Sequence, residues 1–460
     1  LSFTPGLKAA IGGSKKKAAE FLIRQANSVF YSFEEVSGII LRIGECDGND
    51  VKGDFKSELF LRTAAEVNAL IHRLLPVFER HKRNLILRTW TIGAYRVGDL
   101  IWHRRTISRV LHNIDSDHFI LSMKYGESDF FRYLPLNKHF FTAKVKKIIE
   151  LQARREYEGC GEYPSFIGWD YRDYADQLQQ AEQMAGISVW CQTGGWVPFR
   201  RLSYLDEEAV WNELNSFVTI KIFRENQTVA QAVHEFGRQA GWGDHDAVLE
   251  FLKLNDSVIK SLLYIKEIAS QKLFFRRIRI PPLLTVYWNN IFINHSIRVI
   301  LLSLIENPDQ TVAEGREALT KLKTMKKIAR DTGLPVADIE FMEDTFKIIA
   351  LARNYYFLAD EEMAQNKLKK AKRRYKKSYP RSLRPRYRIK TSYHAIPRGM
   401  TQFTSLMRFA LRTKRGYRLV DYLITIHLLG TFYRLLVWIN PKVIPKFARK
   451  QAMGIGAIFR

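Results

Sequence analysis

The chain has 460 residues, of which 46% are hydrophobic and 13% aromatic, which excludes a wholly disordered protein and leaves room for two or three domains. Lysine and arginine outnumber the acids by 73 to 47, a formal net charge of +26, which indicates an acidic partner: nucleic acid, an anionic membrane surface or a negatively charged saccharide. The only cysteines are Cys46, Cys160 and Cys191, so we predict no disulfide framework and no paired-cysteine zinc site, and a reducing compartment is the simpler expectation.

Short apolar runs alternate with longer amphipathic segments over the first half of the chain. Strands buried on both faces are typically continuous apolar runs, so this alternation predicts a parallel sheet with helical crossovers. A helix is expected over residues 57–81, after the first run. The predicted strands are 38–44, 85–90, 119–125, 147–152, 187–191 and 217–223.

Six such units without a glycine-rich phosphate loop favour a (β/α)8 TIM-type barrel over a doubly wound sheet. Two of the eight strands would then be missing. Because the segment before Gly38 shows only a helix-like pattern, over residues 15–33, we expect the first strands to lie upstream of Leu1. The predicted catalytic domain is therefore a partial barrel over residues 1–224.

The apolar spacing changes to a helical period beyond residue 225, which predicts an all-helical domain over residues 225–365. A basic amphipathic region follows over residues 366–460, with 13 lysines and arginines between Lys367 and Lys390. It is either a solvated helix end with a linker or an interfacial helix pair on anionic lipid, spanning residues 367–439; nucleic acid is the less favoured partner.

The longest uncharged stretch in that region, residues 422–433, has 12 residues, well below the roughly 20 that cross a bilayer. We therefore predict no transmembrane helix, and expect the protein in the cytoplasm or at the periphery of a membrane.

Basic side chains lie near the ends of three consecutive predicted strands. Arg42, Arg88 and Lys124 could together grip one carboxylate, because arginine binds it through two parallel hydrogen bonds and lysine adds a point charge. Structural salt bridges with nearby acids are the alternative. Trp90 is the last residue of the second predicted strand and could stack on a sugar ring, although packing in the core also explains it.

Acidic side chains follow the same strands, where a parallel barrel carries its catalytic groups. Glycoside hydrolysis needs an acid for the leaving oxygen and a carboxylate on the opposite face. Glu45 or Asp47 could serve on one side, and Asp129 with Glu156 on the other. Glu158 and Glu162 are expected to be loop acids. No histidine accompanies these acids, which weakens a transition-metal interpretation.

Four motifs in this order resemble the α-glucuronidases of glycoside hydrolase family 67. They are "LRIGECDG" (41–48), "LILRTW" (85–90), "MKYGESDF" (123–130) and "ELQARREYEG" (150–159). The similarity covers roughly residues 20 to 270. It implies a (β/α)8 barrel followed by a helical domain, and removal of α-linked glucuronic acid with inversion and without a cofactor.

The resemblance also implies roles for individual residues. Asp129 and Glu156 match the pair that activates water, while Arg88 and Lys124 match residues that contact the sugar carboxylate. Arg42 retains the charge of a family lysine. The proton donor is Asp47 if the motifs align without a gap, or Glu45 after a local shift.

The leading hypothesis is an inverting glycoside hydrolase that acts on a uronate-containing envelope or capsular polysaccharide. The alternatives are a carbohydrate-binding or scaffold protein that keeps the barrel without hydrolysis, and a basic nucleic-acid-binding protein. The protein could form a homo-oligomer under any of these hypotheses.

Overall fold

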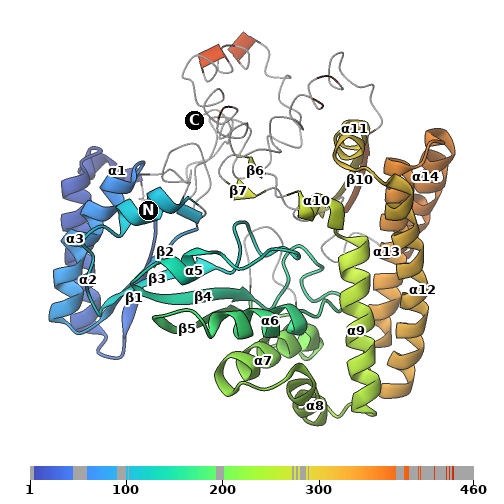
Figure 1. The fold of residues 1–460 in the computed structure, drawn as a ribbon, viewed down its shortest axis with the longest axis horizontal. Helices are drawn as coiled ribbons and strands as arrows, with labels where there is room; N and C mark the ends of the chain where they lie inside the picture. Colours follow the sequence, from blue (N-terminus) through green and yellow to red (C-terminus); the bar gives the residue numbers. More distant parts are fainter. Residues whose placement is uncertain are drawn as a thin grey trace.

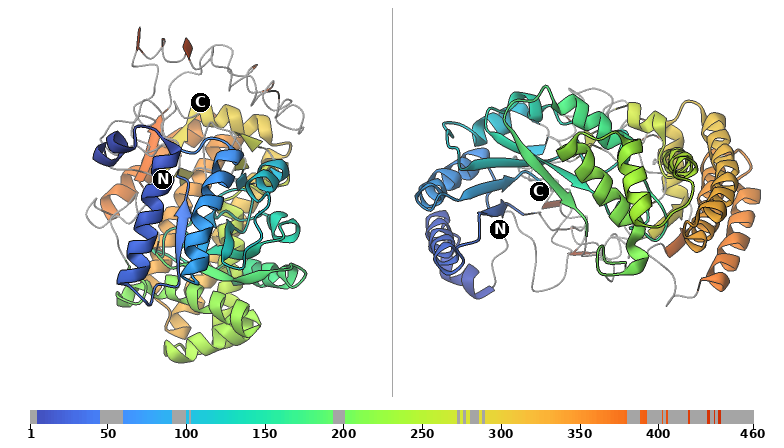
Figure 2. Two further views of the ribbon diagram at one scale, coloured as in Figure 1. Left: turned by 90° about the vertical axis from the view of Figure 1, so that its left-hand side faces the viewer. Right: turned by 90° about the horizontal axis from the view of Figure 1, so that it is seen from below.

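The computed structural model describes residues 5–44, 60–90, 100–101, 103–192, 201–271 and 290–379, with short stretches and single residues in and beyond the remaining gaps. It is a mixed α/β structure in which one parallel sheet lies between helices at both ends of the molecule (Figure 1). The N-terminal helices lie at one end of the molecule, in Figure 1 and in the right panel of Figure 2. Helices α12 (Pro308–Thr332), α13 (Val336–Phe357) and α14 (Glu361–Ser378) lie at the opposite end.

The sheet has five parallel strands in sequential order β1-β2-β3-β4-β5. This confirms the first five predicted strands and the parallel sheet. The strands are β1 (Gly38–Arg42), β2 (Asn84–Arg88), β3 (Phe119–Lys124), β4 (Lys146–Gln152) and β5 (Met184–Trp190). The helices within the connections are α3 (Ala64–Arg80), α4 (Arg104–Val110), α5 (His139–Thr142) and α6 (Gly168–Leu178).

This order is that of neighbouring strands in a (β/α) barrel. Among the described residues, β1 and β5 each pair with a single strand. The sheet is therefore open as far as the structure describes it, and the closed eight-stranded barrel stays a prediction.

The two faces of the sheet differ in polarity because side chains alternate along a strand. Leu87, Leu121 and Ile149 point to one face and are fully buried in the hydrophobic core. Arg88 and Glu150 point to the other face, since alternate positions on each strand point the opposite way. The sheet thus has one apolar face in the hydrophobic core and a second face on which isoleucines such as Ile86 and Ile120 are followed by charged side chains at the carboxyl ends of the strands.

The sixth predicted strand, residues 217–223, is wrong, because these residues belong to helix α7 (Val210–Glu225). Trp211, Leu214, Val218 and Ile222 recur at helical spacing and are all buried. The helix packs against β5, α6 and α8 (Val229–Gln239), so most of its surface is buried, including polar residues such as Asn212 and Asn215. A short apolar run cannot distinguish a buried helix from a buried strand, and tertiary packing overrides the β-branched residues here.

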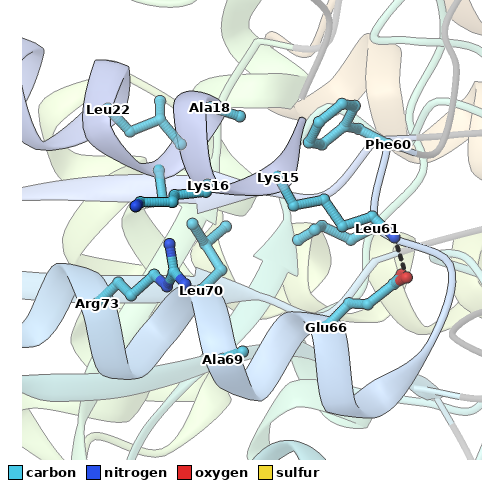
Figure 3. A pocket seen from close by; sticks show the side chains of 11 residues that line it. Lys15, Lys16, Ala18, Leu22, Phe60, Leu61, Glu66, Ala69, Leu70 and Arg73 are labelled. Atoms are coloured by element: carbon cyan, nitrogen blue, oxygen red, sulfur yellow. Dashed lines mark hydrogen bonds and ion pairs between the residues drawn. The ribbon is translucent and has the colours of Figure 1, made fainter. Parts of the chain in front are cut away.

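The helix expected over residues 57–81 is α3, which begins at Ala64. Thr63 caps it: its hydroxyl accepts from the Glu66 amide while the Glu66 carboxylate accepts from the Thr63 amide. This reciprocal capping box fixes the helix start. Glu66 also pairs with Lys15 of helix α2 (Lys15–Ser32), at the edge of a small, mostly apolar pocket of about 120 Å³ between the two helices (Figure 3).

Helices make up most of the described chain beyond residue 225, but the prediction of an all-helical domain over residues 225–365 is wrong. Short strands lie between Phe274 and Asn294, where aromatic and β-branched residues favour strands. The helices are α8 (Val229–Gln239), α9 (His245–Leu262), α10 (Lys266–Ser270), α11 (His295–Leu304), α12 (Pro308–Thr332), α13 (Val336–Phe357) and α14 (Glu361–Ser378). The strands are β6 (Phe274–Phe275), β7 (Ile278–Arg279), β8 (Val286–Tyr287), β9 (Asn290–Asn294) and β10 (Arg388–Ser392), and helix α1 (Pro5–Ile11) precedes α2. Each helix in the described residues is too short or too polar to cross a bilayer.

Candidate functional site

A buried ion pair joins β2 to β4 at the carboxyl end of the sheet. Arg88 Nε donates to both carboxylate oxygens of Glu150 at 2.9 Å, and Arg88 Nη2 lies 2.9 Å from Oε2. Ser122 on the intervening strand donates to Glu150 Oε1 at 2.6 Å. The Arg88 guanidinium also lies 4.2 Å from the ring centre of Trp190, the last residue of β5. Four adjacent strands therefore contribute to one polar cluster.

The second polar group is centred on Lys124, the last residue of β3. Its ammonium pairs with Asp129 and lies 3.4 Å from the ring centre of Trp90 and 4.4 Å from that of Phe130. Asp129 also accepts from the Tyr157 hydroxyl at 2.7 Å and from the Phe130 amide at 2.9 Å. A cation surrounded by aromatic rings and one carboxylate is held rigidly in this arrangement.

Burial and charge act in opposite directions on this pair. Burial lowers the pKa of Lys124 below its usual value, although the Asp129 carboxylate works against that shift. Burial alone would raise the pKa of Asp129, but the Lys124 ammonium, the Tyr157 hydroxyl and the Phe130 amide together hold it below its usual value. Asp129 is therefore a carboxylate at neutral pH.

Glu156 lies in the loop that follows β4. It is half-buried, whereas the residues on either side of it in the chain are buried. Its amide donates to Gln152 Oε1 at 2.7 Å, and the Gln152 side-chain amide donates to the Glu156 carboxylate at 3.4 Å. Gln152 is the last residue of β4 and is fully buried. The strand end thus positions the Glu156 carboxylate, and the adjacent Tyr157 contacts Asp129.

Glu158 is not the solvated loop acid that the sequence predicts. It is fully buried, and Arg132 and Arg155 both form ion pairs with it. Ser165 and Tyr264 donate to the same carboxylate. Burial opposes its ionisation, but the two guanidinium groups outweigh burial and hold the pKa of Glu158 far below its usual value. Glu162 is also buried, 3.5 Å from Arg201 Nε.

Two buried asparagines hold the loop between β4 and α6. Asn215 of α7 donates to the carbonyls of Ala153 and Ser165 at 3.0 and 2.8 Å. Asn255 of α9 donates to the Pro164 carbonyl and accepts from the Phe166 amide, both at 2.9 Å. Since these amides satisfy backbone groups that would otherwise be buried without partners, the loop that carries Glu156 and Tyr157 is rigid.

The structure brings most, but not all, of the predicted site residues together. Arg88, Lys124, Asp129 and Trp90 lie in the two clusters just described, and Arg42 lies beside Arg88 in register but is solvent-exposed. Glu45 and Asp47 fall outside the described residues. The sequence predicts that the basic residues bind a sugar carboxylate. In the structure, Arg88 and Lys124 already form ion pairs with carboxylates of the protein.

Sequence reasoning missed the partners of these bases. Glu150, Ser122, Tyr157 and Trp190 complete the clusters. The position of Glu150 and Trp190 near strand ends was a usable signal, because the carboxyl ends of parallel strands meet at one edge of a sheet. No local signal marks Ser122 or Tyr157. Within the described ranges, no group of three or more His, Cys, Asp and Glu residues could hold a metal ion.

Comparison with known proteins adds little to this geometry. No protein-family model matches the chain, and no curated protein matches it. Among solved structures, a GH138 enzyme targeting pectin rhamnogalacturonan II aligns with a TM-score of 0.43 and 10% sequence identity. The alignment covers 86% of this chain and 46% of that chain, so this chain spans less than half the length of that enzyme. Such a score does not establish a shared fold.

Proposed function

We propose that the protein is a glycoside hydrolase, of inverting type, that cleaves an α-glucuronide-like bond in a uronate-containing saccharide. The observation that supports this proposal best is the polar cluster at the carboxyl end of the sheet. Lys124, Arg88 and Asp129 lie there beside the rings of Trp90 and Trp190. Cations, a carboxylate and aromatic faces are the groups that bind and hydrolyse an acidic sugar.

In this proposal Asp129 and Glu156 activate water. The water oxygen bonds to the anomeric carbon, its proton passes to the carboxylate pair, and the glycosidic oxygen leaves with a proton from an acid. Asp129 suits the accepting role because it is ionised at neutral pH and is oriented by Tyr157. Glu45 or Asp47, which lie outside the described residues, would supply the proton to the leaving group.

The sugar carboxylate would approach Arg88 and Lys124. Arg88 uses Nε and Nη2 for Glu150, and within the described residues its Nη1 makes no hydrogen bond. That nitrogen is the group available for a substrate carboxylate, while Lys124 would share its protons between Asp129 and the sugar.

The test is hydrolysis of oligosaccharides that carry an α-linked glucuronic acid, followed by proton NMR of the released anomer. Replacing Asp129→Asn or Glu156→Gln should lower turnover by at least about 100-fold, the usual contribution of a general base. Asp117→Asn and Glu182→Gln are the matched controls. These exposed acids directly precede β3 and β5, so they lie at the amino ends of the strands, away from the proposed site. Unchanged turnover in the site variants would contradict the assignment.

A second candidate is a carbohydrate-binding or scaffold protein without hydrolysis. The ion pairs of Arg88 with Glu150 and of Lys124 with Asp129 favour it, because such pairs between neighbouring side chains can have a purely structural role. It predicts that the same oligosaccharides bind the wild-type chain and that no product appears on prolonged incubation.

A further inference from the structure

A groove of about 410 Å³ lies over α13 between α12 and α14, at the end of the molecule away from α2 (Figure 1). Helix α14 packs on α13, and α12 packs on both α13 and α9, whereas α12 and α14 contact each other little. Each helix lines the groove with residues spaced three, four or seven apart, which lie on one helix face. The apolar lining includes Val312, Leu319, Ile348, Leu351, Ala371 and Tyr375.

Unpaired cations border this groove on both sides. Arg316 of α12 and Arg374 of α14 are exposed and line it. In the described part of the chain, neither side chain takes part in a hydrogen bond or ion pair. The third lining cation, Lys347, pairs with Glu343 and Asp344. Two guanidinium groups are therefore available at the mouth of an apolar groove.

Arg374 belongs to a longer row of cations on α14. Lys367, Lys370, Arg374 and Lys377 follow one another at helical spacing and are all exposed. They therefore lie on one face of the helix, along the groove edge that Arg374 marks. No other described residue neutralises them through an ion pair or hydrogen bond. Lys369, Arg373 and Lys376 lie toward the other side of the same helix.

We propose that this groove binds the acyl chain of an anionic phospholipid, whose phosphate contacts Arg316 and Arg374, so that α14 rests on an anionic membrane surface. Aliphatic side chains suit an acyl chain. A saccharide or a nucleic-acid base would instead need exposed aromatic faces, and Tyr375, the aromatic residue of the lining, is buried. Rows of four or more basic residues on an amphipathic helix are typical of anionic lipid recognition.

The first experiment compares two triple variants of the full chain that remove equal charge from α14. The groove-side variant is Lys370→Gln, Arg374→Gln and Lys377→Gln, and its control is Lys369→Gln, Arg373→Gln and Lys376→Gln. Co-sedimentation with vesicles of phosphatidylcholine plus phosphatidylserine is measured at about 0.15 M salt, where the screening length of roughly 8 Å is shorter than a helix diameter. The groove-side variant should bind at least tenfold more weakly, and the control should stay close to wild type.

The second experiment fills the groove without changing charge. Leu351→Trp, with Ala371→Leu as an independent variant, should weaken binding of soluble dihexanoyl-phosphatidylserine several-fold. Binding of glycerophosphoserine, which has the head group but no chain, should be weak and unaffected. An unchanged melting temperature shows that the fold is kept.

Several results would overturn the proposal. They are equal losses in the two triple variants, equal binding to pure phosphatidylcholine vesicles, and tight binding of a single-stranded oligonucleotide that only the groove-side variant loses. Unchanged lipid binding in both filled variants would also overturn it.

Discussion

The guanidinium group of Arg88 and the carboxylate of Glu150 form a two-pronged ion pair across the strand that separates them. Nε lies 2.9 Å from both carboxylate oxygens, and Nη2 lies 2.9 Å from one of them. Both side chains are buried. Such a pair stabilises the sheet only as long as both partners are present, because either charge alone would remain buried without compensation.

We therefore expect Arg88→Gln and Glu150→Gln each to lower the free energy of unfolding by about 3–5 kcal/mol. The measurement is urea denaturation followed by circular dichroism. Asp176→Asn is the control, since it breaks the Arg172–Asp176 pair on the surface of α6, where Asp176 is more than half exposed, and should cost less than about 0.5 kcal/mol. Equal losses in buried and exposed pairs would contradict this prediction.

The second prediction concerns Glu158 and pH. The folded pKa of Glu158 lies far below its usual value near 4.5, so the folded state stays unprotonated where the unfolded state takes up a proton. The stability that Glu158 contributes is therefore present above pH 4.5 and is lost as the pH falls below it. Glu158→Gln should be less stable than wild type at pH 7, and the difference should shrink between about pH 4.5 and pH 3.

Urea unfolding of both proteins across that pH range measures the difference. Gln keeps an acceptor for the guanidinium groups of Arg132 and Arg155, so the comparison isolates the charge. A difference that stays constant over that range would contradict the prediction, because it would mean that folding does not shift the pKa of Glu158.

The third prediction follows from the position of Lys124 beside Trp90 and Asp129, and rests on the proposed function. Lys124→Gln should raise KM for a uronate-bearing oligosaccharide at least tenfold, because the sugar carboxylate loses its cation. KM for the matched neutral oligosaccharide should change little. Steady-state kinetics on the two substrates decide the question, and parallel changes in both would indicate a structural role for Lys124.

The fourth prediction concerns Gly333, which ends α12 with a φ of 77°. A Cβ there would have no neighbour within 4 Å, so only the left-handed backbone would disfavour a side chain. We expect Gly333→Ala to destabilise the protein by about 1 kcal/mol. Gly6→Ala is the control: its Cβ is equally unobstructed, but the position is helical, in α1, and should be neutral or slightly stabilising. Thermal denaturation of both variants provides the measurement.

The amino-acid sequence by itself determined the five parallel strands and the long amphipathic helices. Strands such as Phe119–Lys124 are largely apolar runs, and helices such as Pro308–Thr332 repeat apolar residues at helical spacing and end at glycine. These are local patterns. They arise from local backbone preference and from burial, on both faces of a strand and on one face of a helix. The sequence also predicted that bases and acids would gather at the strand ends.

Only the tertiary structure decided which of those groups pair. Arg88 lies 62 positions from Glu150, and Tyr264 lies 106 positions from Glu158, so no local pattern could indicate either contact. Residues 217–223 are helical because surrounding elements bury both sides of α7, which removes the polar face by which a helix is recognised in a sequence. The residues of a segment determine its own periodicity, whereas its contacts depend on which distant segments of the chain pack against it.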